Sequence, residues 1–380
     1  MDFGEGSLEG VVTMTSLFST AFADKRVLLT GHTGFKGAWL AEWLLHLGAE
    51  LTGYALPPPT QPSLFAAAGL AGRLRHIEAD IGDRDHLVRV VKEGRFDFVF
   101  HLAAQPLVRA SYVDPLGTFE TNVLGTAKLL EAIRLAGAPC VAVVVTTDKC
   151  YENREWLHAY REEDPLGGYD PYSSSKAATE LVVSSWRRSF FPAGSPVVLA
   201  SARAGNVIGP GDWAADRIVP DCVRALQCGA VIPVRNKTST RPWQHVLEPL
   251  GGYLSLAAQL AAAKQAGDQT RLAQLASAFN FGPALSSNHT VADLVVEVLK
   301  HWPGHWEDRS DPLAPHEAAK LNLAIDKAHH LLGWAPRWDF PATIQLTIQG
   351  YRHLVDGGPS AQALMQSQIA QYEATELNPS

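Results

Sequence analysis

The chain has 380 residues, of which 46% are hydrophobic, and it carries a formal net charge of −7. This composition supplies a sizeable core, and the absence of long Lys and Arg runs excludes nucleic acid or a membrane surface as the main partner. No apolar run approaches the roughly 18 residues that a membrane span needs.

The first residues lack the basic and apolar regions of a signal peptide, so we expect a cytoplasmic protein. The four cysteines show no paired spacing, which favours reduced thiols over disulfides or zinc. His301 and His305 stand four residues apart, but Pro303 and Gly304 interrupt the helix that would align them. We therefore expect no metal site.

From residue 26 onward, short apolar runs alternate with amphipathic stretches. Strands are predicted at 26–31, 50–56, 73–81, 96–104, 140–148 and 196–209, and helices at 37–48, 84–94, 115–137 and 176–190. Apolar strands that alternate with helices are typical of a parallel sheet covered on both faces. The predicted class is therefore α/β, with a doubly wound parallel sheet of Rossmann type.

The pattern of elements divides the chain into four parts. Residues 1–25 are predicted to form a loose N-terminal extension, and 26–205 a dinucleotide-binding domain that also carries the catalytic residues. Beyond this point the elements shorten and Pro, Gly and Trp become frequent. We assign 206–359 mainly to a smaller substrate-binding lobe, partly interleaved with the sheet, and 360–380 to a C-terminal tail that forms a fraying surface helix.

The first predicted strand is followed by "TGHTGFKG", a glycine-rich turn that opens a helix. Such glycines permit a tight turn and let the backbone approach a pyrophosphate at the helix N-terminus. The predicted contacts of this loop with the cofactor are Gly31, Thr33, Gly34, Phe35, Lys36 and Gly37. A plain glycine-rich turn is the alternative, and the strand–turn–helix context favours the dinucleotide.

Two further strand ends are predicted to hold the cofactor. "EADIGD" places Asp80 and Ile81 where an adenine could be held, and "HLAAQ" places Ala103, Ala104 and Gln105 at the sheet edge. The tip of the second strand, "GYALPPP", offers neither an acid for a ribose hydroxyl nor an arginine. We predict NAD rather than NADP, although this position does not decide between them.

Catalytic residues are predicted from two strings. "YDPYSSSK" contains Tyr172 and Lys176, which share one face of a helix. A lysine close to a phenol favours the phenolate, and the positive nicotinamide ring adds to this, so the pKa of Tyr172 is expected to fall and make it a usable base. "TTDK" places Thr147, Asp148 and Lys149 at the end of the preceding strand.

The chain resembles the extended short-chain dehydrogenase/reductase family, and within it the nucleotide-sugar 4,6-dehydratases. The GxxGxxG spacing of the loop is the version found in extended members of the family. The likeness rests on the strings "GHTGFKGAWL", "HLAAQPLVRASY", "TTDKCYEN", "EEDPLGGYDPYSSSK", "RAGNVIGPGDWAADRIVPD" and "RPWQHVLEPLGGYL". They cover residues 26 to about 255, and "FNFGP" and "LGWAPRW" extend the likeness towards 338.

The resemblance implies an NAD-dependent cycle that makes deoxysugar precursors for lipopolysaccharide O-antigen. Tyr172 removes the proton of the sugar 4-OH during oxidation at C4, and Thr147 hydrogen-bonds the developing keto oxygen. Water is then eliminated across C5 and C6, and the hydride returns to C6. Related dTDP-sugar enzymes carry Thr-Asp-Glu at this strand end. Members that act on CDP-glucose carry a lysine in the third place, so Lys149 favours CDP-glucose as the substrate.

We hypothesise that Asp148 is the acid and Lys149 the C5 base. A lysine acts as a base only when neutral, a form that Lys176 and the cofactor favour and Asp148 opposes. A surface lysine at a strand end is the alternative for an isolated residue.

The resemblance also implies that Asn206, Arg217 and Arg241 hold the substrate diphosphate. It further implies a homodimer or a higher homo-oligomer that pairs through helices at about 115–136 and 172–190. Solvated surface residues are the alternative for each arginine.

Other functions remain open on the same scaffold. A nucleotide-sugar 4-epimerase shares the glycine-rich loop and YxxxK but needs no acid–base pair after Thr147. Another nucleotide-sugar 4,6-dehydratase on this scaffold is a further alternative. A regulatory redox sensor would not require Tyr172 and Lys176, and both are present.

Overall fold

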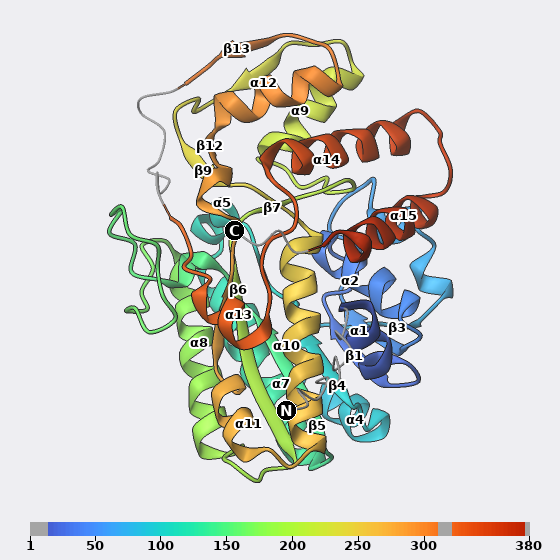
Figure 1. Cartoon of the computed structure of the whole chain (residues 1–380), viewed down its shortest axis with the longest axis vertical. Helices are drawn as coiled ribbons and strands as arrows, with labels where there is room; N and C mark the ends of the chain where they lie inside the picture. The colour runs from blue at the N-terminus through green and yellow to red at the C-terminus, as the bar shows by residue number, and fades with distance from the viewer. Residues whose placement is uncertain (1–13, 311–320, 377–380) are drawn as a thin grey trace, which may run out of the picture.

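A seven-stranded sheet, all of whose strands are parallel, forms the centre of the computed structural model, which describes residues 14–310 and 321–376 (Figure 1). Its strands, in spatial order, are β11 (Ala278–Phe281), β6 (Val197–Ala204), β5 (Cys140–Val145), β4 (Phe98–His101), β1 (Arg26–Thr30), β2 (Glu50–Ala55) and β3 (Arg75–Glu78). Leu29 of β1 pairs with Gly53 of β2 on one side and Phe100 of β4 on the other. The chain order reverses between β1 and β4, where doubly wound sheets bind ligands.

Helices cover both faces of the sheet, as the apolar strands require. One face packs against α1 (Met14–Phe22), α2 (Phe35–His46), α10 (Leu247–Gln265) and α15 (Ala361–Ala374), and the other against α4 (Arg84–Gly94), α7 (Gly125–Ala136) and α8 (Pro171–Ser189). In β5, Val141 and Val143 belong to the first core and Ala142 and Val144 to the second. The predicted Rossmann-type class is therefore confirmed.

A smaller body with its own apolar core lies at one end of the molecule, where Figure 1 shows α9, α12 and α14 together. Its elements are α9 (Ile218–Gln227), α12 (Val291–His301), α14 (Phe340–Val355) and the strand pairs β8 (Ile232–Val234) with β13 (Trp306–Asp308), β9 (Thr240–Pro242) with β12 (Asn288–Thr290), and β7 (Val207–Ile208) with β10 (Gln244–His245). The division of the chain at 205/206 stays a prediction. β11 and α10 come from the second segment and complete the central sheet and its cover.

The remaining elements are short. They are α3 (Leu64–Ala67), α5 (Val108–Val113), α6 (Pro115–Phe119), α11 (Gln269–Leu275), α13 (Asp326–Leu332), η1 (Leu70–Gly72), η2 (Glu120–Leu124), η3 (Asp148–Cys150) and η4 (Leu285–Ser287). The helix predicted at 115–137 is confirmed as a continuous helical segment over 115–136, made of α6, a π-helical turn at η2 and α7. Among the described residues, no helix has both the length and the apolar character that crossing a bilayer requires.

The prediction of a loose extension over residues 1–25 is wrong for its second half. Residues 14–22 form α1, and Phe18 and Phe22 are fully buried. The ring of Phe22 lies 4.8 Å from that of Phe98 in β4, because the sheet face beside α2 and α10 needs an apolar cover. Residues 1–13 lie outside the described part.

The C-terminal tail is likewise more than a surface helix. Residues 361–374 form α15, whose Met365, Ile369 and Tyr372 are buried in the main core. The Tyr372 hydroxyl donates to the carboxylate of Glu248 in α10, at 2.9 Å. The sequence suggested fraying because the apolar residues of this helix are sparse, but the helix packs against α2 and α10. Residues 377–380 lie outside the described part.

Replacing Phe22 with alanine is expected to reduce the free energy of unfolding by about 3–5 kcal/mol, because it leaves a cavity in the place of a fully buried ring. Urea denaturation followed by circular dichroism measures this loss. Thr20→Ala on the exposed side of the same helix is the matched control and should change little. If the two variants unfold alike, α1 does not contribute to the core.

Candidate active site

The glycine-rich turn between β1 and α2 builds one wall of the site. Gly31 has φ +75°, and a Cβ there would stand 2.7 Å from the amide nitrogen of Ala103. A Cβ on Gly37 would stand 2.1 Å from the carbonyl oxygen of Gly31. Both positions therefore require glycine. α2 begins at Phe35 with Gly34 as its N-cap, so no side chain covers the first backbone N–H groups, which can bind an anion.

A cavity of about 930 Å³ runs along the carboxyl edge of the sheet beside this turn. The predicted cofactor residues that line it are Gly31, Thr33, Gly34, Phe35, Lys36, Gly37, Asp80, Ile81, Ala103, Ala104, Tyr172 and Lys176. The cavity thus joins a helix N-terminus, small residues after β4 and the YxxxK pair. A dinucleotide fits this arrangement, because the diphosphate would meet the turn and the two ends would extend along the sheet edge.

Gln105 is the exception among the predicted cofactor residues, because it is not part of the cavity lining. Its side-chain amide donates to Thr118 and its side-chain oxygen accepts from the Leu107 amide, at 2.9 and 2.6 Å. Gln105 therefore shapes the loop after β4 from behind, and the prediction of a cofactor contact is not supported. At the end of β2, Leu56 and Pro57 line the cavity. Within the part of the chain that the structure describes, no acidic side chain therefore stands at this strand end that could bind a ribose hydroxyl of the cofactor.

The strand-end trio and the YxxxK pair lie together. The side chain of Thr147 hydrogen-bonds Tyr172, and its hydroxyl donates to the Asp148 carboxylate at 2.9 Å. Thr147 also caps the short η3 turn, which holds Asp148 in place. α8 begins at Pro171 with Asp170 as its N-cap, and this fixes Tyr172 and Lys176 one turn apart.

Burial controls the titration of these groups. It raises the pKa of Tyr172 to about 12, opposite to the expected fall, because desolvation of the phenolate outweighs the hydrogen bond between Tyr172 and Thr147. It lowers the pKa of Lys176 to about 8. The residues of the chain alone therefore keep the Tyr172 phenol protonated at neutral pH. The expected fall included the positive nicotinamide, which the chain does not supply.

Asp148 is the buried carboxyl of the site. Desolvation raises its pKa, against the pull of the neighbouring Lys149 and of the Thr147 hydrogen bond. Its Oδ2 faces Gly205, where an added Cβ would stand only 2.9 Å away. A carboxyl that is desolvated in this way can hold a proton and deliver it to a leaving group.

Lys149 stands at the junction of two cavities. It lines the 930 Å³ cavity together with Thr147, and it also lines a second cavity of about 410 Å³ beneath the smaller body. Asn206 and Arg217 line both cavities, whereas Arg241 lines only the second. The three predicted diphosphate residues are thus brought together with Lys149.

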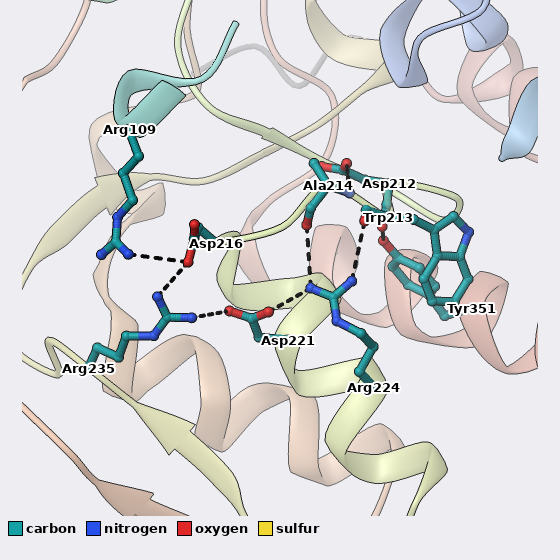
Figure 2. Close-up of polar contacts among 9 residues, drawn as sticks. All are labelled: Arg109, Asp212, Trp213, Ala214, Asp216, Asp221, Arg224, Arg235 and Tyr351. Carbon is teal, nitrogen blue, oxygen red and sulfur yellow. Dashed lines mark hydrogen bonds and ion pairs between the residues drawn. The ribbon is translucent and has the colours of Figure 1, made fainter. Parts of the chain in front are cut away.

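These arginines are held by local partners. Arg217 pairs with Asp212 at 2.8 Å, and Arg241 donates to the Ser239 hydroxyl at 2.6 Å. Ion pairs also join residues that line the second cavity: Figure 2 shows Asp216 between Arg109 and Arg235. The lining of the second cavity therefore combines the predicted diphosphate residues with a set of paired charges.

Sequence reasoning missed the residues that support the site from below. Glu180 of α8 is buried and accepts from Thr146 at 2.5 Å, Ser201 at 2.8 Å and Arg203 at 2.9 Å. This network ties α8 to β5 and β6 directly beneath the catalytic trio. Its sequence signal was a charged residue inside an apolar helix face and an arginine inside an apolar strand.

Asn122 was also missed. It lies in the π-helical turn η2, where its amide donates to the Ser175 hydroxyl at 2.8 Å and its oxygen accepts from the Gln105 amide at 2.8 Å. Ser111 of α5 accepts from the Tyr172 amide at 3.1 Å. The sequence carries no signal for a π turn, so the role of Asn122 could not be read from it.

Comparison with known proteins places this geometry in a family. The model of the GDP-mannose 4,6 dehydratase family matches residues 28–347. The chain is 46% identical to the CDP-glucose 4,6-dehydratase of Salmonella typhimurium, over 88% of this chain and 92% of that protein. It is 30% identical to a dTDP-glucose 4,6-dehydratase of Streptomyces antibioticus, over 86% of this chain and 92% of the relative.

Solved structures show the same fold. The dTDP-glucose 4,6-dehydratase of Streptomyces venezuelae, solved with NAD bound, superposes with a TM-score of 0.73 at 24% identity, over 88% of this chain and 98% of the other. The UDP-glucose 4-epimerase of Thermus thermophilus in complex with NAD gives 0.69 at 25% identity, over 86% and 99%. The chain belongs to the nucleotide-sugar dehydratase family of short-chain dehydrogenase/reductase type, the family described by the GDP-mannose 4,6 dehydratase model.

Proposed function

We propose that this protein converts CDP-glucose to CDP-4-keto-6-deoxyglucose with NAD, a step in deoxysugar and O-antigen precursor synthesis. The observation that carries the proposal is the juxtaposition of Thr147, Asp148 and Lys149 with Tyr172 at the junction of the two cavities. The similarity to the Salmonella enzyme supports CDP-glucose as the substrate.

The turn from Gly31 to Gly37 would hold the cofactor diphosphate, and Tyr172 and Lys176 would lie at its nicotinamide end. NAD supplies, when bound, the acceptor and later the donor of the hydride. Tyr172 takes the proton of the 4-hydroxyl, and Lys176 stabilises the phenolate that this step requires. Thr147, whose side chain hydrogen-bonds Tyr172, would turn its hydroxyl from the Asp148 carboxylate to donate to the developing keto oxygen.

We assign the elimination of water to Asp148 and Lys149, which follow the end of β5. Lys149 removes the C5 proton that the keto group has acidified, and Asp148 gives its proton to the departing C6 hydroxyl. The raised pKa of Asp148 suits this role, because the acid must hold a proton at neutral pH. Asn206, Arg217 and Arg241, which line the second cavity together with Lys149, bind the diphosphate.

The test is to supply CDP-, dTDP-, GDP- and UDP-glucose separately with NAD and to identify the sugar product by mass spectrometry and NMR. The proposal predicts a 4-keto-6-deoxy product, formed fastest from CDP-glucose. A 4-epimerase on this scaffold would return a hexose of unchanged mass, and the buried Asp148 beside Thr147 argues against it. If a 4-keto-6-deoxy product forms only from another nucleotide sugar, the proposed reaction stands and the assignment of CDP-glucose as the substrate is wrong.

We also propose that the protein is a cytoplasmic homodimer that pairs through α7 and α8 and the segment before them. Large apolar side chains are exposed there: Leu116 at 76%, Leu124 at 51% and Leu181 at 61%. A second copy of the same surface would cover them. Leu116 and Leu124 lie on the segment predicted at 115–136, and Leu181 on α8.

The double substitution Leu124→Glu with Leu181→Glu is expected to convert the dimer to a monomer, because it buries unpaired charge at the interface. Sedimentation velocity measures the mass. Leu285→Glu, which alters an equally exposed leucine of η4, is the control and should stay dimeric. A wild-type monomer, or a double variant of unchanged mass, would contradict this interface.

A further inference from the structure

The lining of the second cavity carries charges that the proposed mechanism does not use. Asp216, Asp221 and Arg235 line this cavity together with Lys149. If the hexose meets Lys149 and the diphosphate meets Asn206 and Arg241, the nucleoside must occupy the rest of the cavity, whose lining includes these three residues. The inference therefore rests on the proposed function.

The carboxylate of Asp216 is presented by a fixed loop. Arg235 contacts its Oδ1 at 2.6 Å and Arg109 contacts the same oxygen at 3.3 Å, as Figure 2 shows. Arg109 belongs to α5 and Arg235 follows β8, so Asp216 links two segments that both line the cavity. Within the described residues, both ion pairs use Oδ1, which leaves Oδ2 able to accept a further hydrogen bond.

The loop itself is braced from behind. Arg224 of α9 donates to the carbonyl oxygens of Trp213 and Ala214, at 3.3 and 3.4 Å, and the Tyr351 hydroxyl of α14 donates to the Asp212 carbonyl (Figure 2). Asp216 then adopts a left-handed backbone with φ +60°. Non-glycine residues occupy this region rarely, and such strain is retained where the surrounding structure holds it.

A carboxylate only accepts hydrogen bonds, and the paired arginines keep this one ionised by holding the pKa of Asp216 below its ordinary value. Cytosine presents an exocyclic amino group at position 4, whereas uracil and thymine present an oxygen acceptor there. An acceptor opposite position 4 therefore attracts cytosine and repels the other two pyrimidines.

We propose that Asp216 selects the nucleobase of the substrate: its carboxylate accepts a hydrogen bond from the 4-amino group of cytosine and rejects the O4 atom of uracil and thymine. Arg235, the closer of the two arginine partners, orients the carboxylate, and the braced loop holds it in the wall of the cavity. Asp216 thus acts as a specificity-determining residue, and the chemistry at the hexose does not depend on it.

Asp216→Asn is the direct test. Asparagine tolerates a left-handed backbone as aspartate does, so the variant changes the hydrogen-bonding character and charge without adding backbone strain. Its amide can turn its N–H groups towards O4 and accept uracil. The measured quantity is the ratio of the dissociation constants of UDP and CDP, by calorimetry on the NAD-loaded enzyme.

The wild type is expected to bind CDP more tightly than UDP, and Asp216→Asn should reduce this preference about tenfold or more. Arg109→Gln is the matched control, because it removes an ion pair of Asp216 and leaves the carboxylate. It should weaken both nucleotides to a similar extent and keep their ratio. Melting temperatures of both variants confirm that they fold.

The two proposals fail in different ways. A wild type with no preference for CDP, or a folded Asp216→Asn variant with the wild-type ratio, overturns the role of Asp216. A CDP preference that Asp216→Asn abolishes supports this role even if CDP-glucose is not converted, because binding of the diphosphates needs no turnover. In that case only the proposed conversion of CDP-glucose is refuted.

Discussion

Replacing Tyr172 with phenylalanine is expected to lower kcat by about 10² to 10⁴-fold, because the variant lacks the base that removes the 4-hydroxyl proton. The ring stays in place, so the cavity and the helix start at Pro171 are retained. Cofactor affinity, measured by fluorescence titration, should change little. Product formation from CDP-glucose measures the loss.

The pH dependence of the wild type adds to this test. The Tyr172 phenol must lose a proton before it can act, and burial raises its pKa in the chain alone to about 12. The rate of oxidation at C4, which does not use Asp148, should therefore rise as pH increases through the neutral range, because a larger fraction of the phenol is ionised. Tyr169→Phe, three residues earlier and 89% exposed, is the control and should keep both the rate and the profile. A Tyr172→Phe enzyme with the wild-type rate would remove Tyr172 from the mechanism.

Replacing Lys149 with methionine is expected to stop the elimination while leaving oxidation at C4. Thr147, Tyr172 and Lys176, which serve the oxidation, are untouched by this change. Incubation with CDP-glucose in heavy water measures the exchange at C5, which should fall by about 10² to 10⁴-fold. The near-ultraviolet absorbance of reduced nicotinamide reports the oxidation independently.

Lys149→Arg separates a base from a fixed charge. Arginine keeps the positive charge but cannot become neutral in a protein, so it cannot remove the C5 proton. Both variants should therefore lose the exchange. If Lys149→Met exchanges at the wild-type rate, another group is the base. If Lys149→Arg restores the exchange, the lysine contributes charge alone.

The central sheet could be predicted because its signals are local. "CVAVVV" and "FDFVFHLAA" are continuous apolar runs, and each became a buried parallel strand. The glycine-rich turn was predictable for the same reason: Gly31 and Gly37 are required by contacts within one strand–turn–helix unit and its neighbour.

The structure of the two terminal segments could not be predicted, because their burial depends on partners that are distant in the sequence. Phe18 and Phe22 pack in one core with α10 and the sheet, which are distant in the sequence, so the residues around them give no local sign that the segment is buried. The same holds for Tyr372, whose partner Glu248 is 124 residues away in the chain. Gln105 is held in place by Asn122, whose side-chain oxygen accepts a hydrogen bond from the Gln105 backbone amide. Asn122 stands in a π turn that the sequence does not indicate.

The direction of the pKa change at Tyr172 was missed for a related reason. YxxxK spacing shows that a lysine shares the helix face, but it does not show how deeply the pair is buried. Burial opposes the phenolate and lowers the pKa of Lys176 as well, and in the chain alone desolvation outweighs the groups that favour ionisation of Tyr172.

The most direct test of the proposed reaction follows the C4 hydrogen through one turnover. CDP-glucose labelled with deuterium at C4 is incubated with the enzyme and NAD, and the product is analysed by NMR. The proposed mechanism predicts a 4-keto-6-deoxy sugar that carries the deuterium at C6, because the hydride taken from C4 returns within the same site. Deuterium that remains at C4, or a product that retains its C6 hydroxyl, would contradict it.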